Sequence, residues 1–129
     1  MYSGLIRDWP KRVCFGPGSV RELPNLMAAL GAKRAGVICG KSVAGGPIFP
    51  AVKAALGPLY AGVFAEVPAH TPFSSVVAAA AALKAMNADC AISVGGGSTI
   101  DAGKGVVLLA ATGGAFAPYV IDYGGKGSM

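Results

Sequence analysis

Short apolar runs rich in β-branched residues recur along the chain, and longer Ala- and Leu-rich segments separate them. Each run is bounded by Gly, Pro or charged residues, which is typical of strands buried inside a sheet. The runs predict four strands, at Arg12–Phe15, Ala35–Cys39, Tyr60–Val67 and Cys90–Val94.

Helix signals lie between these strands. Ser19 and Glu22 have the spacing of a capping box, and Gly31 provides a stop after Leu30. A last helix is predicted from about Thr99 to Ala111. Two further helices are bounded by Pro47 or Pro50 and Gly57-Pro58, after a looser stretch from Gly40 to Pro47, and by Ser74 or Ser75 and about Met86.

Strands that alternate with helices in this way predict an α/β fold, with a Rossmann-like parallel sheet, flanking helices and right-handed crossovers. In such sheets ligands bind beyond the carboxyl ends of the strands, where Gly40, Pro68 and Gly95 fall. After Thr112 the chain is Gly-rich, and only Tyr119–Tyr123 has the composition of a strand.

Composition narrows the class of protein. A chain of 129 residues with 53% hydrophobic residues fits one globular domain, and no apolar segment has the length of a membrane span. The net charge of +5 comes from scattered Lys and Arg, whereas nucleic-acid binding needs a cluster. Three cysteines without CxxC spacing indicate buried thiols in a reducing compartment, so we expect a cytoplasmic protein.

The segment from Ala91 to Lys104 carries the clearest functional signal. An apolar strand stops at Gly95-Gly96-Gly97, and a helix follows at once. Residues without Cβ atoms let backbone amides approach an anion, and the helix N-terminus adds unpaired donors and partial positive charge. The segment therefore predicts a turn that binds phosphate.

Two familiar phosphate-binding patterns do not fit this turn. GxxxxGK[ST] would need Gly at Ser98 and Ser or Thr at Gly105, and GxGxxG would need Gly at Ile100. The pattern present is GGGSxxDxxK. Ser98 and Asp101 have capping-box spacing, and Lys104 lies three residues after Asp101 on the same helix face, so all three residues can also be explained as a good helix start.

GGGSTIDAGK after a strand resembles the coenzyme-binding signature of the iron-containing alcohol dehydrogenase family, which includes the maleylacetate reductases. The segment from Arg12 to Ser19 is similar to that family's opening strand and FGxG turn, and matches in order run to about Gly114. The resemblance implies that residues 1–129 form an NAD(P)-binding α/β domain, without the helical domain that carries the metal in the family.

The resemblance also implies site residues. Gly95, Gly96, Gly97 and Ser98 would wrap the coenzyme pyrophosphate, with Asp101 and Lys104 lining the cleft toward the nicotinamide. Many relatives place an Asp after the second strand, whereas this chain has Gly40 and then Lys41, which relaxes selection against NADP and favours NADP or dual use. Thr71 and His70 are weaker candidates for contacts with coenzyme or substrate.

In the family, Fe²⁺ or Zn²⁺ is held by one Asp and three His, but His70 is the only histidine of this chain, so we expect no metal site here. The implied function is hydride transfer between a small alcohol and NAD(P), giving an aldehyde or ketone, with little or no turnover by these 129 residues alone. The alternatives are a maleylacetate reductase, an enzyme similar to the glycerol-phosphate dehydrogenases or dehydroquinate synthases, and a non-catalytic nucleotide-binding remnant. An uncovered apolar face would favour a homo-oligomer.

Overall fold

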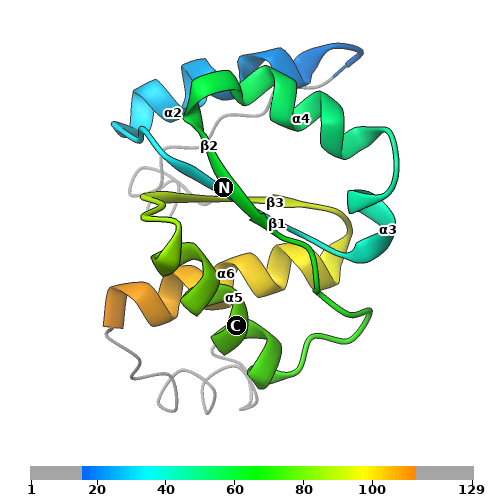
Figure 1. Cartoon of the computed structure of the whole chain (residues 1–129), viewed down its shortest axis with the longest axis vertical. Coiled ribbons are helices and arrows are strands. Elements are labelled where there is room, and N and C mark those ends of the chain that lie inside the picture. Colours follow the sequence, from blue (N-terminus) through cyan, green and yellow to red (C-terminus); the bar gives the residue numbers. More distant parts are fainter. Residues whose placement is uncertain (1–15, 113–129) are drawn as a thin grey trace, which may run out of the picture.

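The computed structural model describes residues 16–112, so the predicted strands at Arg12–Phe15 and Tyr119–Tyr123 lie outside the described residues. A three-stranded parallel sheet lies between two layers of helices (Figure 1). The elements in chain order are η1 (Ser19–Glu22), α2 (Leu23–Leu30), β1 (Ala35–Cys39), α3 (Lys41–Ala44), α4 (Ile48–Leu56), η2 (Gly57–Leu59), β2 (Tyr60–Phe64), α5 (Phe73–Ala85), β3 (Cys90–Val94) and α6 (Gly97–Thr112).

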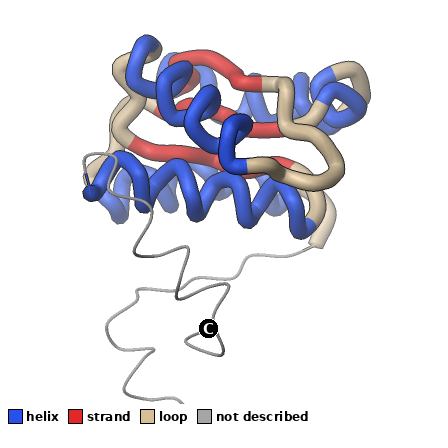
Figure 2. Tube along the Cα trace, turned by 90° about the horizontal axis from the view of Figure 1, so that it is seen from below, coloured by secondary structure: helices blue, strands red, loops and turns tan. Residues whose placement is uncertain are grey.

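The predicted α/β class with a parallel sheet is confirmed. The strand order is β2-β1-β3, and the three strands lie side by side (Figure 2). Both pairings are parallel, with Val37 opposite Val63 and Cys39 opposite Val94. The strand at Cys90–Val94 is found as predicted, whereas β2 ends at Phe64, three residues earlier than predicted.

The central strand β1 is buried along its whole length because helices cover both of its faces. Val37 packs in a cluster with Met27, Val52 and Leu56, which come from α2 and α4. Ile38 belongs to the opposite cluster, built by α5 and α6, whose other members include Val76, Ala79, Leu83, Val106 and Leu109. The alternation of β1 side chains thus holds the two helix layers on the two faces of the sheet.

Two helices end at glycines, as predicted, whereas the predicted side-chain caps at the helix starts are not formed. Gly31 and Gly57 end α2 and α4 with φ of 73° and 55°. The capping box predicted at Ser19 is wrong: residues 19–22 form a 3-10 turn, and the Glu22 carboxylate accepts a hydrogen bond from Asn25 at 3.2 Å. Ser74 and Ser75 do not cap α5 either, because that helix already begins at Phe73, after Pro72.

Two further boundaries differ from the sequence prediction. The stretch from Gly40 to Pro47 contains the short helix α3, because Ala44 and Gly45 donate backbone hydrogen bonds to Gly40 and Lys41. The last helix begins at Gly97, so the third glycine of the triplet is its first residue. Within residues 16–112, no helix is long and apolar enough to cross a membrane.

Asp89 connects the amino-terminal ends of β1 and β3 by hydrogen bonds. Its carboxylate accepts hydrogen bonds from the backbone amides of Arg34 at 2.8 Å and Lys33 at 3.0 Å, and its own amide donates to the Arg34 carbonyl at 2.9 Å. These bonds connect the start of β1 with the start of β3. The Arg34 amide, followed by the Lys33 amide, lowers the pKa of Asp89 from its ordinary value.

Replacing Asp89 by Asn should lower the melting temperature at neutral pH, because the carboxylate is the acceptor of both amides. A lowered folded-state pKa means that this stabilisation is present above the unfolded-state pKa and is lost as the pH falls through the folded value. Melting curves of Asp89→Asn and the parent chain should therefore differ most at neutral pH and converge in acid. Asp101→Asn, which removes an exposed carboxylate from α6, is the control. If Asp89→Asn and the parent chain had equal melting temperatures at every pH, the stabilising role assigned to the Asp89 carboxylate would be contradicted.

Candidate functional site

The turn after β3 is shaped by Gly95. This residue has φ of 149°, a conformation that side-chain-bearing residues rarely adopt, and a Cβ here would lie 2.8 Å from Oγ1 of the buried Thr99. Gly95 is therefore required by the protein's own packing. It lets the chain leave β3 and enter α6 directly above Thr99.

Gly96 and Gly97 are different, because the fold does not need them to be glycine. Both are exposed, and a Cβ on either would meet no described atom within 4 Å. Their bare backbone faces open space just where α6 begins. The Ile100 amide donates to the Gly96 carbonyl at 3.1 Å, and the amides before it, in the first turn of the helix, lack intrahelical acceptors. An exposed glycine pair followed by such amides suits a bound anion.

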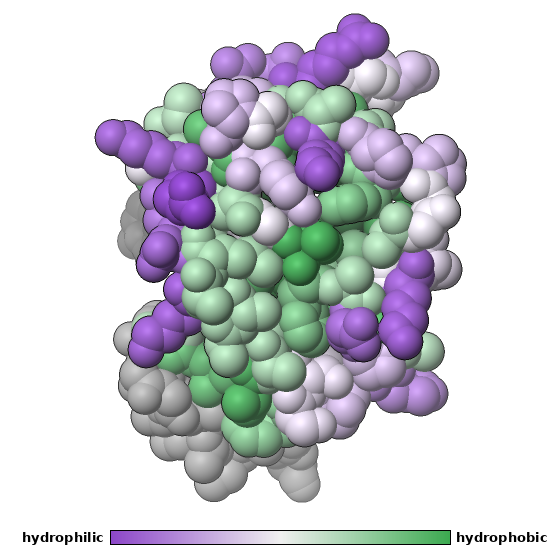
Figure 3. Space-filling model, viewed as in Figure 1, coloured by the Kyte–Doolittle hydropathy of each residue, from purple (hydrophilic) through white to green (hydrophobic). Residues whose placement is uncertain are grey.

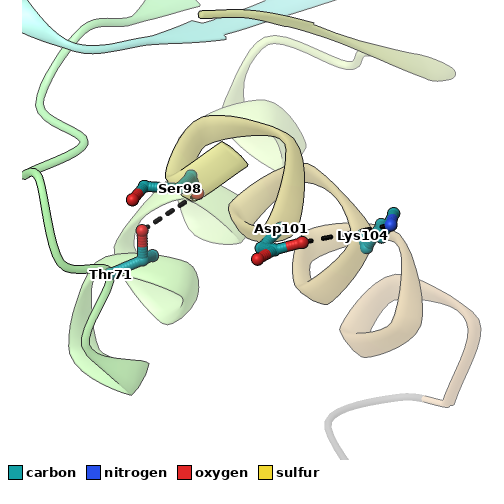
Figure 4. A network of polar contacts seen from close by, with 4 residues as sticks. All are labelled: Thr71, Ser98, Asp101 and Lys104. Carbon is teal, nitrogen blue, oxygen red and sulfur yellow. Dashed lines mark hydrogen bonds and ion pairs between the residues drawn. The ribbon is translucent and has the colours of Figure 1, made fainter. Parts of the chain in front are cut away.

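Ser98 does not cap α6, so the predicted capping box with Asp101 is wrong. Its hydroxyl instead donates to the carbonyl of Ala69, in the loop after β2. In return, Thr71 Oγ1 donates to the Ser98 carbonyl at 3.0 Å, and Figure 4 shows Thr71 directed at the first turn of α6. These two bonds fasten the loop that contains His70 to the glycine turn. Ser98 and Thr71 are thus brought together, as two predicted site residues distant in sequence.

Asp101 and Lys104 lie further along α6 and point toward each other (Figure 4). Lys104 Nζ is 3.9 Å from Asp101 Oδ1, and the two side chains are 71% and 76% exposed. The predicted i,i+3 relation on one helix face is confirmed. An exposed pair at this distance contributes little to stability, so both charges are accessible to a ligand over this face.

Gly40 and Lys41 follow β1 on the same edge of the sheet. A Cβ at Gly40 would lie 2.9 Å from the Val67 carbonyl, so a larger residue there would require the neighbouring loop to shift. Lys41 Nζ lies 3.9 Å from Glu66 Oε1. Sequence reasoning missed Glu66, although its position two residues beyond β2 places it at the carboxyl edge, where ligands bind in parallel sheets.

The strand order explains why these segments meet. The chain passes from β1 to β2 on one side and returns to β3 on the other, so β1 and β3 form the point where the connections reverse. Cys39 pairs with Val94, which makes Gly40 and Gly95 the residues that follow directly on neighbouring strands. Ligands of open parallel sheets bind in the crevice at such a point.

Two cysteines and a histidine of the described residues are further reactive groups; Cys39 and His70 lie toward the carboxyl edge, whereas Cys90 begins β3 at the amino-terminal edge. Cys39 is buried in β1, and burial raises the pKa of both Cys39 and Cys90, with the Asp89 charge adding to the effect on Cys90. Both thiols therefore stay protonated near neutral pH and are poor nucleophiles. His70 is exposed, between the two residues that bond to Ser98.

The described residues do not supply a transition-metal site. Across residues 16–112, no three His, Cys, Asp or Glu side chains come together in a geometry that could hold a metal ion. The chemistry available here is therefore that of amides, hydroxyls and the exposed charges of Lys41, Glu66, Asp101 and Lys104. This set can bind and orient an anionic ligand.

Replacing Gly95 by Ala should destabilise the chain by roughly 1–3 kcal/mol, because the backbone would be strained and the new methyl group would press on Thr99. Chemical denaturation followed by circular dichroism would measure the change. Gly96→Ala, whose methyl group meets open space, should change stability by less than about 0.5 kcal/mol. If both variants were equally stable, the proposed requirement for glycine at position 95 would be incorrect.

Comparison with known proteins shows which family this chain resembles. A family model described as iron-containing alcohol dehydrogenase matches residues 10–128. Maleylacetate reductase from Rhizobium sp. strain MTP-10005 is 40% identical over 77% of this chain, and 4-hydroxybutyrate dehydrogenase from Cupriavidus necator is 31% identical over 84% of it; the matches cover 28% of each of those proteins.

Comparison with solved structures finds members of the same group of enzymes. The crystal structure of maleylacetate reductase from Agrobacterium tumefaciens superposes with a TM-score of 0.69 and 38% identity, over 77% of this chain and 28% of that one. The chain thus spans a little over a quarter of the length of these relatives. It belongs to the iron-containing alcohol dehydrogenase family.

Proposed function

We propose that the chain is the coenzyme-binding part of an NAD(P)-dependent oxidoreductase that interconverts a small alcohol and its aldehyde or ketone. The observation that carries the proposal is the open backbone of Gly96 and Gly97 at the start of α6. Family membership supports the same reading, since the family is one of alcohol dehydrogenases. When bound, the nicotinamide coenzyme supplies hydride transfer.

The residues of the carboxyl edge fit a dinucleotide. The amides of Gly97, Ser98 and Thr99 would hold the pyrophosphate, because they precede the first intrahelical bond of α6. Gly40 has no side chain, so a ligand can pass over the end of β1 next to it. The bonds between Ser98, Ala69 and Thr71 hold the neighbouring loop against the start of α6.

Asp101 and Lys104 are the proposed residues toward the nicotinamide end, and Thr71 and His70 are secondary candidates. Lys104 adds positive charge beside the phosphate turn, which suits an anionic ligand. The side chains that would hold Fe²⁺ or Zn²⁺ in a whole enzyme are not provided by residues 16–112, so no step through a metal is assigned to them. Turnover by the 129 residues alone is expected to be slight.

A second candidate is specifically the reduction of maleylacetate. Five relatives named maleylacetate reductase are 32–40% identical to this chain over 75–81% of its length. The matches cover only 27–28% of each of these proteins, so this similarity supports the candidate without separating it from other alcohol dehydrogenases. Whole-enzyme assays with maleylacetate and with simple alcohols would separate the two.

A homo-oligomer and a cytoplasmic location stay predictions. Several apolar side chains of the described residues are exposed, among them Ile48, Val77 and Val107. Figure 3 shows apolar surface in the middle of one face, with hydrophilic residues around its margins. Such a surface favours association with further protein.

Calorimetric titration of the purified chain with NADH and with NADPH tests the proposal. Binding of at least one nucleotide is expected, and Gly97→Ala should weaken it about tenfold, because the added methyl group enters the space that the pyrophosphate needs. Gly45→Ala, at an exposed glycine where a Cβ would make ordinary contact at 3.5 Å, is the matched control. A folded chain that binds neither nucleotide would overturn the proposal and favour the non-catalytic remnant.

A further inference from the structure

Lys41 and Glu66 form a pair of opposite charges that the phosphate turn does not use. Lys41 Nζ and Glu66 Oε1 are 3.9 Å apart, and the side chains are 81% and 65% exposed. Together with Val67 and Pro68 they line a hollow of about 340 Å³. The pair is thus a charged site at the carboxyl edge, with room beside it for a ligand group.

The hollow and the glycine turn lie on either side of Gly40. On one side, the Val67 amide donates to the Cys39 carbonyl at 3.2 Å, which holds the segment after β2 against the end of β1. On the other side, Cys39 pairs with Val94, the last residue before Gly95. Two strand spacings, roughly 10 Å, therefore separate Val67 from the phosphate turn. A ribose bonded to a pyrophosphate at Gly96 and Gly97 can reach this hollow across Gly40.

An acidic side chain of the kind that dinucleotide sites use to bind a ribose hydroxyl would fit at position 40 only if the neighbouring loop shifted. A Cβ there would lie 2.9 Å from the Val67 carbonyl, a backbone atom that cannot rotate away. In dinucleotide-binding folds, a carboxylate at a strand end accepts the hydrogen bond of the adenosine 2′-hydroxyl. In the described part of this chain, Glu66 provides a carboxylate beside Lys41, from the segment that follows the neighbouring strand.

We propose that Lys41 and Glu66 together read the 2′ position of the adenosine ribose, an inference that rests on the proposed coenzyme function. With NAD, Glu66 accepts the hydrogen bond of the 2′-hydroxyl while Lys41 keeps the pair neutral. With NADP, Lys41 leaves Glu66 and pairs with the 2′-phosphate, which Glu66 opposes. An exposed pair at 3.9 Å contributes little to stability, so its opening is easy. The parent chain accordingly accepts both coenzymes.

Two variants should shift the preference in opposite directions. Glu66→Gln removes the repulsion and frees Lys41, so the ratio of the dissociation constants for NADPH and NADH should fall about five- to tenfold. Lys41→Gln removes the cation, so the same ratio should rise about tenfold. Calorimetric titrations of both variants with NADH and NADPH provide the ratios.

Lys84→Gln is the control, because it removes the same charge from the last turn of α5 at the opposite edge of the sheet. It should leave the ratio within about twofold of the parent, since more distant exposed charges are screened. Circular dichroism of each variant establishes that it is folded.

The outcomes separate this inference from the proposed function. If both nucleotides bind to the parent and neither variant changes the ratio, the assignment of Lys41 and Glu66 is wrong and the coenzyme function stands. If the parent chain is folded and binds neither nucleotide, the proposed function fails and this inference fails with it. Opposite shifts, absent in the control, support the assignment.

Discussion

The structure depends on the way the chain turns from β3 into α6. Gly95 adopts a backbone conformation that residues with side chains rarely adopt, and the buried Thr99 occupies the space where a Cβ of residue 95 would lie. That contact fixes where α6 begins, and Gly103 then lets the helix lie against Ser93 of β3, since a Cβ there would overlap the serine hydroxyl. The free amides at the start of α6 are consequently held in one place. A site of this kind is pre-organised, because the fold and not the ligand sets its geometry.

The sheet brings the remaining parts of the site to this turn. The reversal of connections between β1 and β3 puts Gly40 beside Gly95, and Ser98 and Thr71 join the loop after β2 to the same place. Segments that are 27 to 55 residues apart in the sequence thus share one edge of the sheet. The anchoring bonds of Asp89 lie at the other edge, away from the residues proposed to bind the ligand.

Sequence patterns were sufficient for β1 and β3, whereas β2 ends three residues before its predicted limit and α6 begins two residues before its own. The runs at Ala35–Cys39 and Cys90–Val94 were predicted with their observed bounds, because buried strands leave a nearly continuous apolar signal. The side-chain caps were not predictable in the same way. Ser98 has a cap's position in the sequence, but the carbonyl of Ala69 lies close enough in space to take its hydroxyl proton.

Glu66 shows a second limit of sequence reasoning. Glu66 matters because its carboxylate lies 3.9 Å from the Lys41 ammonium group. Lys41 follows β1 and Glu66 follows β2, so no local spacing in the sequence reveals that the two side chains are close. The roles proposed for Gly95 to Ser98, Gly40, Lys41 and Thr71 rest on their shared position at the carboxyl edge of the sheet. Those proposed for Asp101 and Lys104 rest on their exposed position further along α6.

The central claim is that the amides after β3 receive the coenzyme phosphates. Titration of ¹⁵N-labelled chain with NADH, followed by amide chemical shifts, tests it most directly. The account predicts that the largest shifts occur at Gly96, Gly97, Ser98 and Thr99, with smaller shifts at Gly40. Shifts confined to the outer faces of α5 and α6, with the glycine turn unaffected by saturating NADH, would contradict it.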